Sequence, residues 1–265
     1  MRRELCAAVV VGTMSLAINS AWSQTSVIQQ NNASSQTSVI QQNSVSVNSE
    51  GSSVTISGGT ITVDTQTSGR GRVVGNGQRA SDQRAIGPVT AIRSDGAFQL
   101  TIKNGLPPRL TIEADKNILP IIKTTVTDGR LEIYSDQSYS TDRRIDVSVS
   151  SPNIMDISAA GSNHIAAEGF AGGPLSIEMN GSSSAVLAGK VAGLTCVMAG
   201  ANHLSANQLT ADSVNITLSG SGDASVYARQ QIAAQISGAG SVRVYGNPKE
   251  RNTGVAGAGK ITFVE

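Results

Sequence analysis

A glycine returns every 18 to 20 residues through the last part of the chain. The repeated positions are Gly161, Gly181, Gly200, Gly220, Gly238 and Gly257. Around five of the six, apolar residues lie six, four and two positions before the glycine and four and six positions after it, as with Leu194, Cys196 and Met198 before Gly200. Alternation with a period of two is typical of β-strands that bury one face. A fixed period predicts stacked structural units, which leaves few folds open to this chain.

The period predicts an all-β fold, namely a parallel β-helix or β-solenoid with about 19 residues per rung, where a rung is one full turn of the chain. A single rung cannot bury its apolar side chains, so neighbouring rungs must share one narrow core. The glycines suit corners that need a positive φ angle, which is costly for other residues. We assign the repeat part to residues 151–265 and expect an irregular β-sheet section over 73–150 before it.

Residues 1–23 resemble a cleavable signal peptide. Arg2 and Arg3 precede an apolar run from Leu5 to Ile18, and Ala21-Trp22-Ser23 offers a cleavage site. An uncleaved anchor is the alternative. With cleavage, the mature chain has no transmembrane segment and is exported to the periplasm or the cell surface. Cys6 is then removed, so Cys196 is left without a disulfide partner, and its place in the apolar pattern predicts a buried side chain.

Residues 24–72 form a compositionally separate linker, rich in Gln, Asn, Ser and Thr. The sequence QTSVIQQN occurs twice, at 24–31 and 36–43. Alternating Val and Ile residues predict some strand, with a hairpin turn at Gly58-Gly59. A weakly charged, β-prone segment of this kind is also a candidate for self-association.

Residues 73–150 lack the glycine period but contain alternating runs at 97–103, 109–113, 130–134 and 145–149. Turn signals such as Asn104-Gly105 and Asp128-Gly129 separate them. Pro120 interrupts the run 117–126, which argues against a long helix there and favours an edge strand or a bent strand. We expect this part to cover the first open end of the stack.

The third residue after each repeat glycine forms a column along the outside of the predicted stack. Its members are His164, Ser184, His203, Asp223, Ser241 and Lys260. Ser184, His203 and Asp223 would be neighbours, and they are the residue types of a nucleophile, a base and an orienting acid. Turns favour small polar residues in any case, and nothing marks an oxyanion hole, so we predict no catalytic residues. The column also offers too few ligands for one metal ion, so we predict no metal site and no cofactor.

The amino-acid composition excludes some classes of binding partner. The chain has a formal net charge of +1, with 20 basic and 19 acidic residues, and this balance argues against nucleic acid as a partner. Aromatic residues are 3% of the chain, so ring platforms that could stack on bases or sugars are scarce. Outward positions in the repeats, such as Glu178, Asn215 and Gln235, form no cluster of carboxylates.

The stretch from Val73 to Glu265 resembles the putative auto-transporter adhesin head GIN domain family of exported bacterial proteins. The resemblance rests on VTAIRSDGAFQLTIKNG at 89–105, on RLTIEADKNILPIIKTTVTDGRLEIY at 109–134 and on the ordered glycine repeats down to VAGAGKI at 255–261. It implies an all-β domain with a β-helix-like repeat section. It implies no established activity and no catalytic residues. Asn163-His164 and Asn202-His203 depart from the family's commonest glycine-serine turn.

These observations favour a non-enzymatic exported module that has a structural or binding role at the bacterial envelope, with a surface glycan or an envelope protein as its partner. A carbohydrate-active enzyme on the same scaffold is the alternative, and it predicts a groove with at least two neighbouring carboxylates. Self-assembly through residues 24–64 is a third hypothesis.

Overall fold

The computed structural model describes residues 72–264 in full and residues 26–32, 35–41, 45–47, 54–56 and 64–67 as strands. The chain divides into two compact units, Met1–Gly71 and Arg72–Glu265. The predicted signal peptide at 1–23 and the hairpin turn predicted at Gly58-Gly59 lie outside the described residues.

The first unit contains five short strands: β1 (Ser26–Asn32), β2 (Ser35–Gln41), β3 (Val45–Val47), β4 (Val54–Ile56) and β5 (Asp64–Thr67). All of their pairings are antiparallel: β1 with β2, β2 with β5, and β3 with β4. The duplicated QTSVIQQN sequence therefore supplies two strands that pair with each other, with Val27 opposite Ile40.

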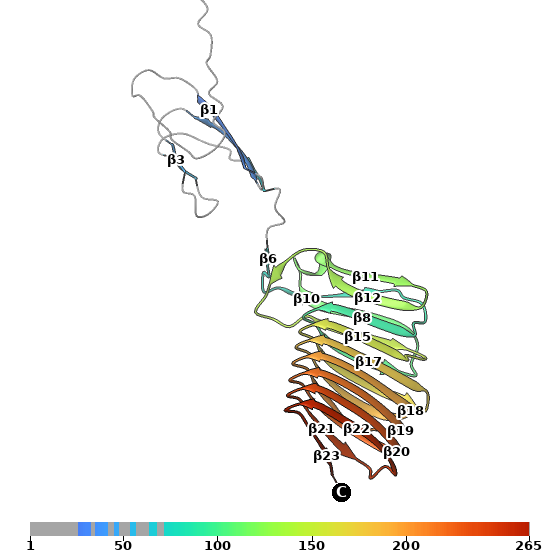
Figure 1. Ribbon diagram of the computed structural model, residues 1–265. Coiled ribbons are helices and arrows are strands. Elements are labelled where there is room, and N and C mark those ends of the chain that lie inside the picture. The colour runs from blue at the N-terminus through green and yellow to red at the C-terminus, as the bar shows by residue number, and fades with distance from the viewer. Residues whose placement is uncertain are drawn as a thin grey trace, which may run out of the picture. The chain divides into compact units, whose positions relative to one another are not determined.

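The second unit is built from strands throughout (Figure 1). They are β6 (Val73–Val74), β7 (Arg79–Arg84), β8 (Ala91–Gly96), β9 (Gln99–Asn104), β10 (Arg109–Asp115), β11 (Ile122–Thr127), β12 (Arg130–Ser135), β13 (Tyr139–Ser140), β14 (Asp146–Ser151), β15 (Asp156–Gly161), β16 (His164–Ala171), β17 (Pro174–Gly181), β18 (Ser184–Gly200), β19 (His203–Gly220), β20 (Asp223–Gly238), β21 (Ser241–Tyr245), β22 (Glu250–Gly257) and β23 (Lys260–Phe263). The helical geometry described between residues 72 and 264 is one 3₁₀ turn, Leu119–Ile121. The all-β prediction is confirmed.

Two parallel sheets face each other across the core. Sheet 1 contains β12, β8, β15, β17, the second halves of β18, β19 and β20, and then β22. Sheet 2 contains β14, β9, β16, the first halves of β18, β19 and β20, and then β21 and β23. The three longest strands, β18 to β20, bend through a corner with register shifts and so belong to both sheets. This is the predicted solenoid.

The stack begins earlier in the chain than the repeats indicate. β8 and β9 are parallel to β15 and β16 and form the first rung, although they lie within the section 73–150 that we expected to be irregular sheet. β12 and β14 lie next to this rung and are still parallel to β8 and β9, and the direction of pairing changes only beyond them. β11 ends sheet 1 as an antiparallel edge strand directly after Pro120, while β10 and β7 are antiparallel strands that end sheet 2. These strands cover the first open end of the stack, as expected.

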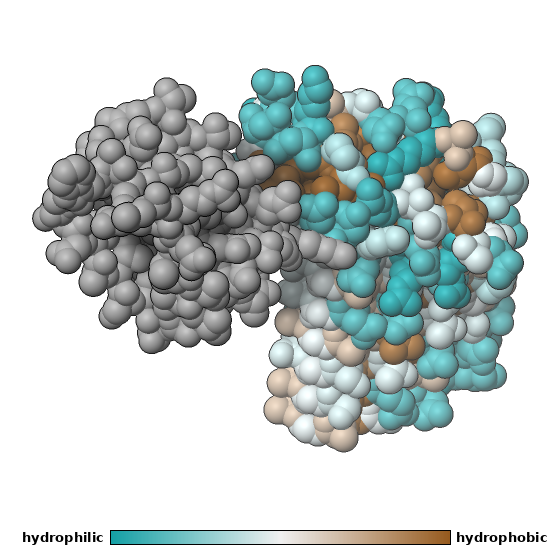
Figure 2. All heavy atoms as spheres, turned by 90° about the horizontal axis from the view of Figure 1, so that it is seen from above, coloured by the Kyte–Doolittle hydropathy of each residue, from teal (hydrophilic) through white to brown (hydrophobic). Residues whose placement is uncertain are grey.

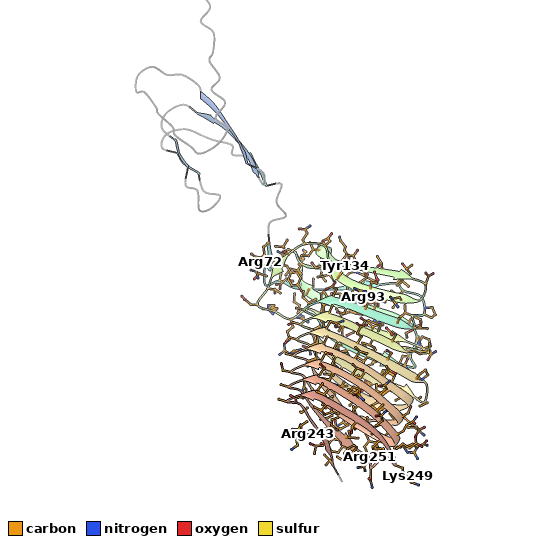
Figure 3. All side chains as sticks on the ribbon, in the orientation of Figure 1. Arg72, Arg93, Tyr134, Arg243, Lys249 and Arg251 are labelled. Atoms are coloured by element: carbon orange, nitrogen blue, oxygen red, sulfur yellow. The ribbon has the colours of Figure 1, made fainter. Side chains whose placement is uncertain are left out.

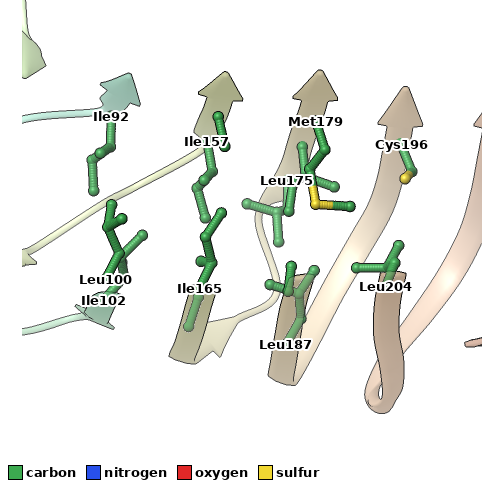
Figure 4. Close-up of a cluster of buried hydrophobic side chains, with 14 of the residues drawn as sticks. Ile92, Leu100, Ile102, Ile157, Ile165, Leu175, Met179, Leu187, Cys196 and Leu204 are labelled. Atoms are coloured by element: carbon green, nitrogen blue, oxygen red, sulfur yellow. The ribbon is translucent and has the colours of Figure 1, made fainter. Parts of the chain in front are cut away.

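The core is a double row of apolar side chains. In sheet 1, Ile157 lies between Ile92 and Ile177, and Cys196 follows in the same row. In sheet 2, Leu100, Ile165 and Leu204 belong to the facing row (Figure 4). All of these side chains are buried. Each large one stabilises the fold by ~1.5–3 kcal/mol, but only while the neighbouring rungs are present to cover it.

Glycines form a continuous column at the corner that joins sheet 1 to sheet 2. The six predicted positions all have positive φ angles and stack in register on one another. A Cβ atom on Gly200 would lie 2.3 Å from the carbonyl oxygen of Gly181, and that same oxygen accepts a hydrogen bond from the Ala201 amide at 2.9 Å. The close backbone approach excludes any side chain. Gly96 is a seventh member at the end of β8, under Gly161.

Buried polar side chains connect the rungs just inside this corner. Asn202 is buried and donates to the Ala199 carbonyl oxygen at 2.7 Å and to the Met179 carbonyl oxygen of the preceding rung at 3.1 Å. Its side-chain oxygen, Oδ1, accepts a hydrogen bond from the Ser183 backbone amide at 2.8 Å. Asn163 likewise donates to the Ala160 carbonyl oxygen at 2.8 Å. Both asparagines therefore satisfy turn backbone, as their position after the glycine indicates.

The other end of the stack is not covered by a further strand within residues 72–264. There β22 and β23 form the last rung, and Val255 is 46% exposed. Arg251 occupies an inward position, paired with Ile232 of the rung before. Its guanidinium lies 4.0 Å from the centre of the Phe263 ring and donates to the Pro248 carbonyl oxygen. An inward charge on an edge strand discourages another strand from adding there.

Gly200→Ala should destabilise the fold by about 3 kcal/mol, because the new methyl group meets backbone at a φ of +104°. The matched control is Gly87→Ala, where no atom lies within 4 Å of the added methyl group. Urea unfolding curves measure both variants. Equal stability of the two would contradict the role of the glycine column.

Arg251→Ile should promote end-to-end association, because it removes the charge that lies over the exposed end of the core. Light scattering after size exclusion should give a higher mass for this variant than for the unmutated protein. Arg243→Ile, on the side of the stack, is the control and should leave the mass unchanged. An unchanged mass for Arg251→Ile would show that the guanidinium does not limit the stack.

Cys196 should be unreactive in the folded protein, because burial raises the pKa of its thiol from 9.0 to about 12. In the unfolded chain the thiol ionises near its ordinary pKa, so the contribution of Cys196 to stability is complete below pH 9 and is lost between pH 9 and about 12. The melting temperature should therefore fall more steeply in this range than that of Cys196→Ala. Rapid labelling of the folded chain by a thiol reagent would contradict this.

Candidate functional site

The predicted outer column forms on sheet 2. Strand register places Gln99, His164, Ser184, His203, Asp223, Ser241 and Lys260 side by side along successive strands. Asp146 extends it at the covered end, next to Gln99. The glycine corner lies only three residues before each repeat member, so the stacked glycines hold the column in register.

The hydrogen bonds in this column differ from those of a catalytic triad. Ser184 Oγ lies 3.1 Å from Nδ1 of His164, not next to a ring nitrogen of His203. Asp223 accepts a hydrogen bond from the Ser241 hydroxyl. The register thus places Ser184, His203 and Asp223 together, but within residues 72–264 no hydrogen bond joins His203 to either of the others.

In the described part of the chain, no three His, Cys, Asp or Glu side chains lie close enough together to bind one metal ion. His164 and His203 are separated by the strand of Ser184, as the repeat predicts.

A hollow of about 630 Å³ lies on sheet 1 near the covered end of the stack. It is lined by Arg93, Asp95 and Gly96 from β8 and by the segment Glu132–Ser135 from β12. Figure 3 shows Arg93 and Tyr134 at this end, with Arg243, Lys249 and Arg251 at the other. Figure 2 looks onto the covered end and shows mostly hydrophilic side chains around a few hydrophobic ones.

Ser135 in the lining donates to the Gln137 carbonyl oxygen at 2.6 Å, but the larger polar side chains of this hollow have no partners within residues 72–264. No hydrogen bond or ion pair in that range involves the side chain of Arg93, Asp95, Glu132 or Tyr134. Several charged residues on adjacent elements are paired instead, as in Arg79–Glu113 at 3.2 Å, Arg84–Asp82 at 2.9 Å and Lys123–Asp136 at 3.4 Å. The hollow therefore gathers donors and acceptors that the fold does not use.

Sequence reasoning missed this hollow. The outward residues of β8 and β12 appear in the alternating runs that predicted strands, but the chain pairs β12 in parallel with β8 although three strands, β9, β10 and β11, lie between them in the sequence. The only available signal was the alternation of charged residues with buried ones in AIRSDG and RLEIYS. A second hollow, of about 390 Å³, lies at the far end of sheet 1 between Thr217 and Ala256, and no charged side chain lines it.

Within the described residues, no helix is long and apolar enough to span a bilayer.

Comparisons with known proteins agree with this architecture. A solved structure of a protein described as a putative adhesin from Bacteroides fragilis is similar at a TM-score of 0.60 with 17% identity, covering 72% of this chain and all of that one. A putative lipid binding protein from Parabacteroides distasonis matches at a TM-score of 0.46 and 20% identity, over 73% of this chain and all of that one. A putative adhesin from Parabacteroides merdae matches at 0.44 and 16%, over 73% and 99%. The first of these supports the fold alone.

No curated protein sequence is similar enough to this chain to count as a relative. The family described as putative auto-transporter adhesin, head GIN domain, matches residues 88–248, which include the first rung, the hollow and most of the repeats. The chain belongs to this family of head GIN domains.

Proposed function

We propose that this protein is a non-enzymatic binding module of the bacterial envelope, exported by the signal peptide at 1–23 to the periplasm or the cell surface. A surface glycan or an envelope protein is its partner. Membership of a family described as adhesin heads supports a binding role. The exported location is supported by the N-terminal sequence and by the family description.

The observation that carries the proposal is the hollow on sheet 1. Binding sites are concave and hold a few convergent polar groups on rigid elements. Arg93, Asp95, Glu132 and Tyr134 meet this description, because they project from two paired strands and form no hydrogen bond or ion pair within residues 72–264. The rest of the outer surface is regular strand with polar residues, which offers an extended contact area beside the hollow.

A carbohydrate-active enzyme remains the second candidate because the hollow contains two carboxylates, Asp95 and Glu132, on neighbouring strands. Glycoside hydrolysis needs such a pair on opposite sides of the bond that is cleaved. Release of sugar fragments from a polysaccharide panel, abolished by Glu132→Gln and unaffected by the remote Glu250→Gln, would establish the enzyme in place of the binding module.

Self-assembly through residues 24–64 is a separate proposal. The antiparallel pairing of β1 with β2, which both contain SVIQ from the duplicated sequence, supports it, since identical segments can also pair between chains. Removal of residues 24–64 should abolish any fibre formation, measured by thioflavin fluorescence.

The binding proposal predicts saturable attachment of the labelled full mature chain to bacterial or host cells. Deletion of the gene should reduce adhesion or biofilm formation. Surface plasmon resonance on isolated envelope fractions checks the first expectation, with heat-unfolded protein as the control. Absence of binding in every fraction, together with unchanged adhesion in the deletion strain, would contradict the proposed function.

A further inference from the structure

We propose that the hollow between β8 and β12 binds a saccharide, specifically a neutral or amino sugar. This inference rests on the proposed binding function and names the chemistry of the partner. It follows from the arrangement of four outward side chains on two parallel strands.

The register of these strands builds a compact square of functional groups. Glu132 is paired with Arg93, and Tyr134 is paired with Asp95. Neighbouring strands lie ~4.8 Å apart, and alternate residues of one strand are ~6.6 Å apart, so the square is about the size of one pyranose ring. The intervening residues Ser94 and Ile133 are buried, which fixes the four side chains on the outer face.

The chemical types in this square match the surface of a sugar. Carboxylates of Asp95 and Glu132 accept hydrogen bonds from hydroxyl groups, and the Arg93 guanidinium donates to hydroxyl or ring oxygens. Tyr134 is 36% exposed and offers both a ring face for the C–H groups of a pyranose and a phenolic hydroxyl. In a chain with 3% aromatic residues, an exposed ring beside three unpartnered charged groups is an unusual concentration of recognition chemistry.

The charge of the side chains that line the hollow determines which class of sugar fits it. Two carboxylates and one guanidinium line the hollow, so the local balance is negative. Two further cations flank the hollow without lining it: Arg130, two residues before Glu132 on the outer face of β12, and Lys123, which lies beside Tyr134 on β11 and is paired with Asp136. Uronic and sialic acids would place a carboxylate against this negative surface, whereas hydroxyls or the ammonium group of an amino sugar would complement it.

The test is a titration of the ¹⁵N-labelled full mature chain, followed by amide shifts, with chitotriose, glucosamine trimer, maltotriose and trigalacturonate as probes. At least one of the first three should shift the amides of Gly96 and Ile133–Ser135, and trigalacturonate should not. Tyr134→Ala and Glu132→Gln should weaken that binding by about tenfold or more. The matched controls Tyr245→Ala and Arg243→Ala, at the other end of sheet 2, should not change it.

Three outcomes would overturn the inference: no shift of those amides with any probe at about 10 mM, equal binding by trigalacturonate, or full binding by a folded Tyr134→Ala. A cell-attachment assay distinguishes failure of the saccharide site from failure of the proposed binding function. If the mature chain attaches to cells and Tyr134→Ala attaches equally well, the protein is a binding module that uses another surface. If saccharides bind in the hollow but no cell fraction does, the saccharide site stands and the envelope role fails.

Discussion

The close contact between glycine backbones at one corner is the constraint on which the whole domain depends. Gly200 and Gly181 approach so closely that the carbonyl oxygen of one occupies the space of a side chain on the other. Because this contact recurs from Gly96 to Gly257, it holds successive rungs in one register. In-register stacking then aligns everything else, including the two buried apolar rows, the asparagines inside the corner and the polar column outside it.

The repeat made most of this architecture predictable from sequence. Gly161 to Gly257, the buried Cys196 and the alignment of His164, Ser184 and His203 all follow from counting along one period. Gly96 was not predictable in that way, because 65 residues that include the antiparallel strands β10 and β11 separate it from Gly161. The hydrogen-bond partner of Ser184 was also not predictable from the pattern. The strand register places a histidine on each side of Ser184, and only the side-chain geometry selects His164.

The hollow illustrates a different limit. Its residues come from β8 and β12, which are far apart in the sequence and pair in parallel. The sequence period does not predict this pairing. The same strand order leaves Arg93, Asp95 and Glu132 unpaired within residues 72–264, while several charged residues nearby form ion pairs, such as Glu113 on β10 and Lys123 on β11. The stacked strands satisfy their own backbone hydrogen bonds, so the fold does not need these outward side chains and they can contact a ligand. This arrangement favours the proposed binding role over chemistry at a buried group.

The two ends of the stack differ from each other, whereas the rungs between them repeat. The number of rungs can therefore change independently of the two ends. One end is closed by antiparallel strands and bears the hollow, while the other finishes at Arg251. The rungs between them contact chiefly their immediate neighbours, so a duplication of one rung in the gene, for example of residues 201–220, would add a rung without altering either end. The number of rungs can therefore change while the hollow at the closed end stays the same.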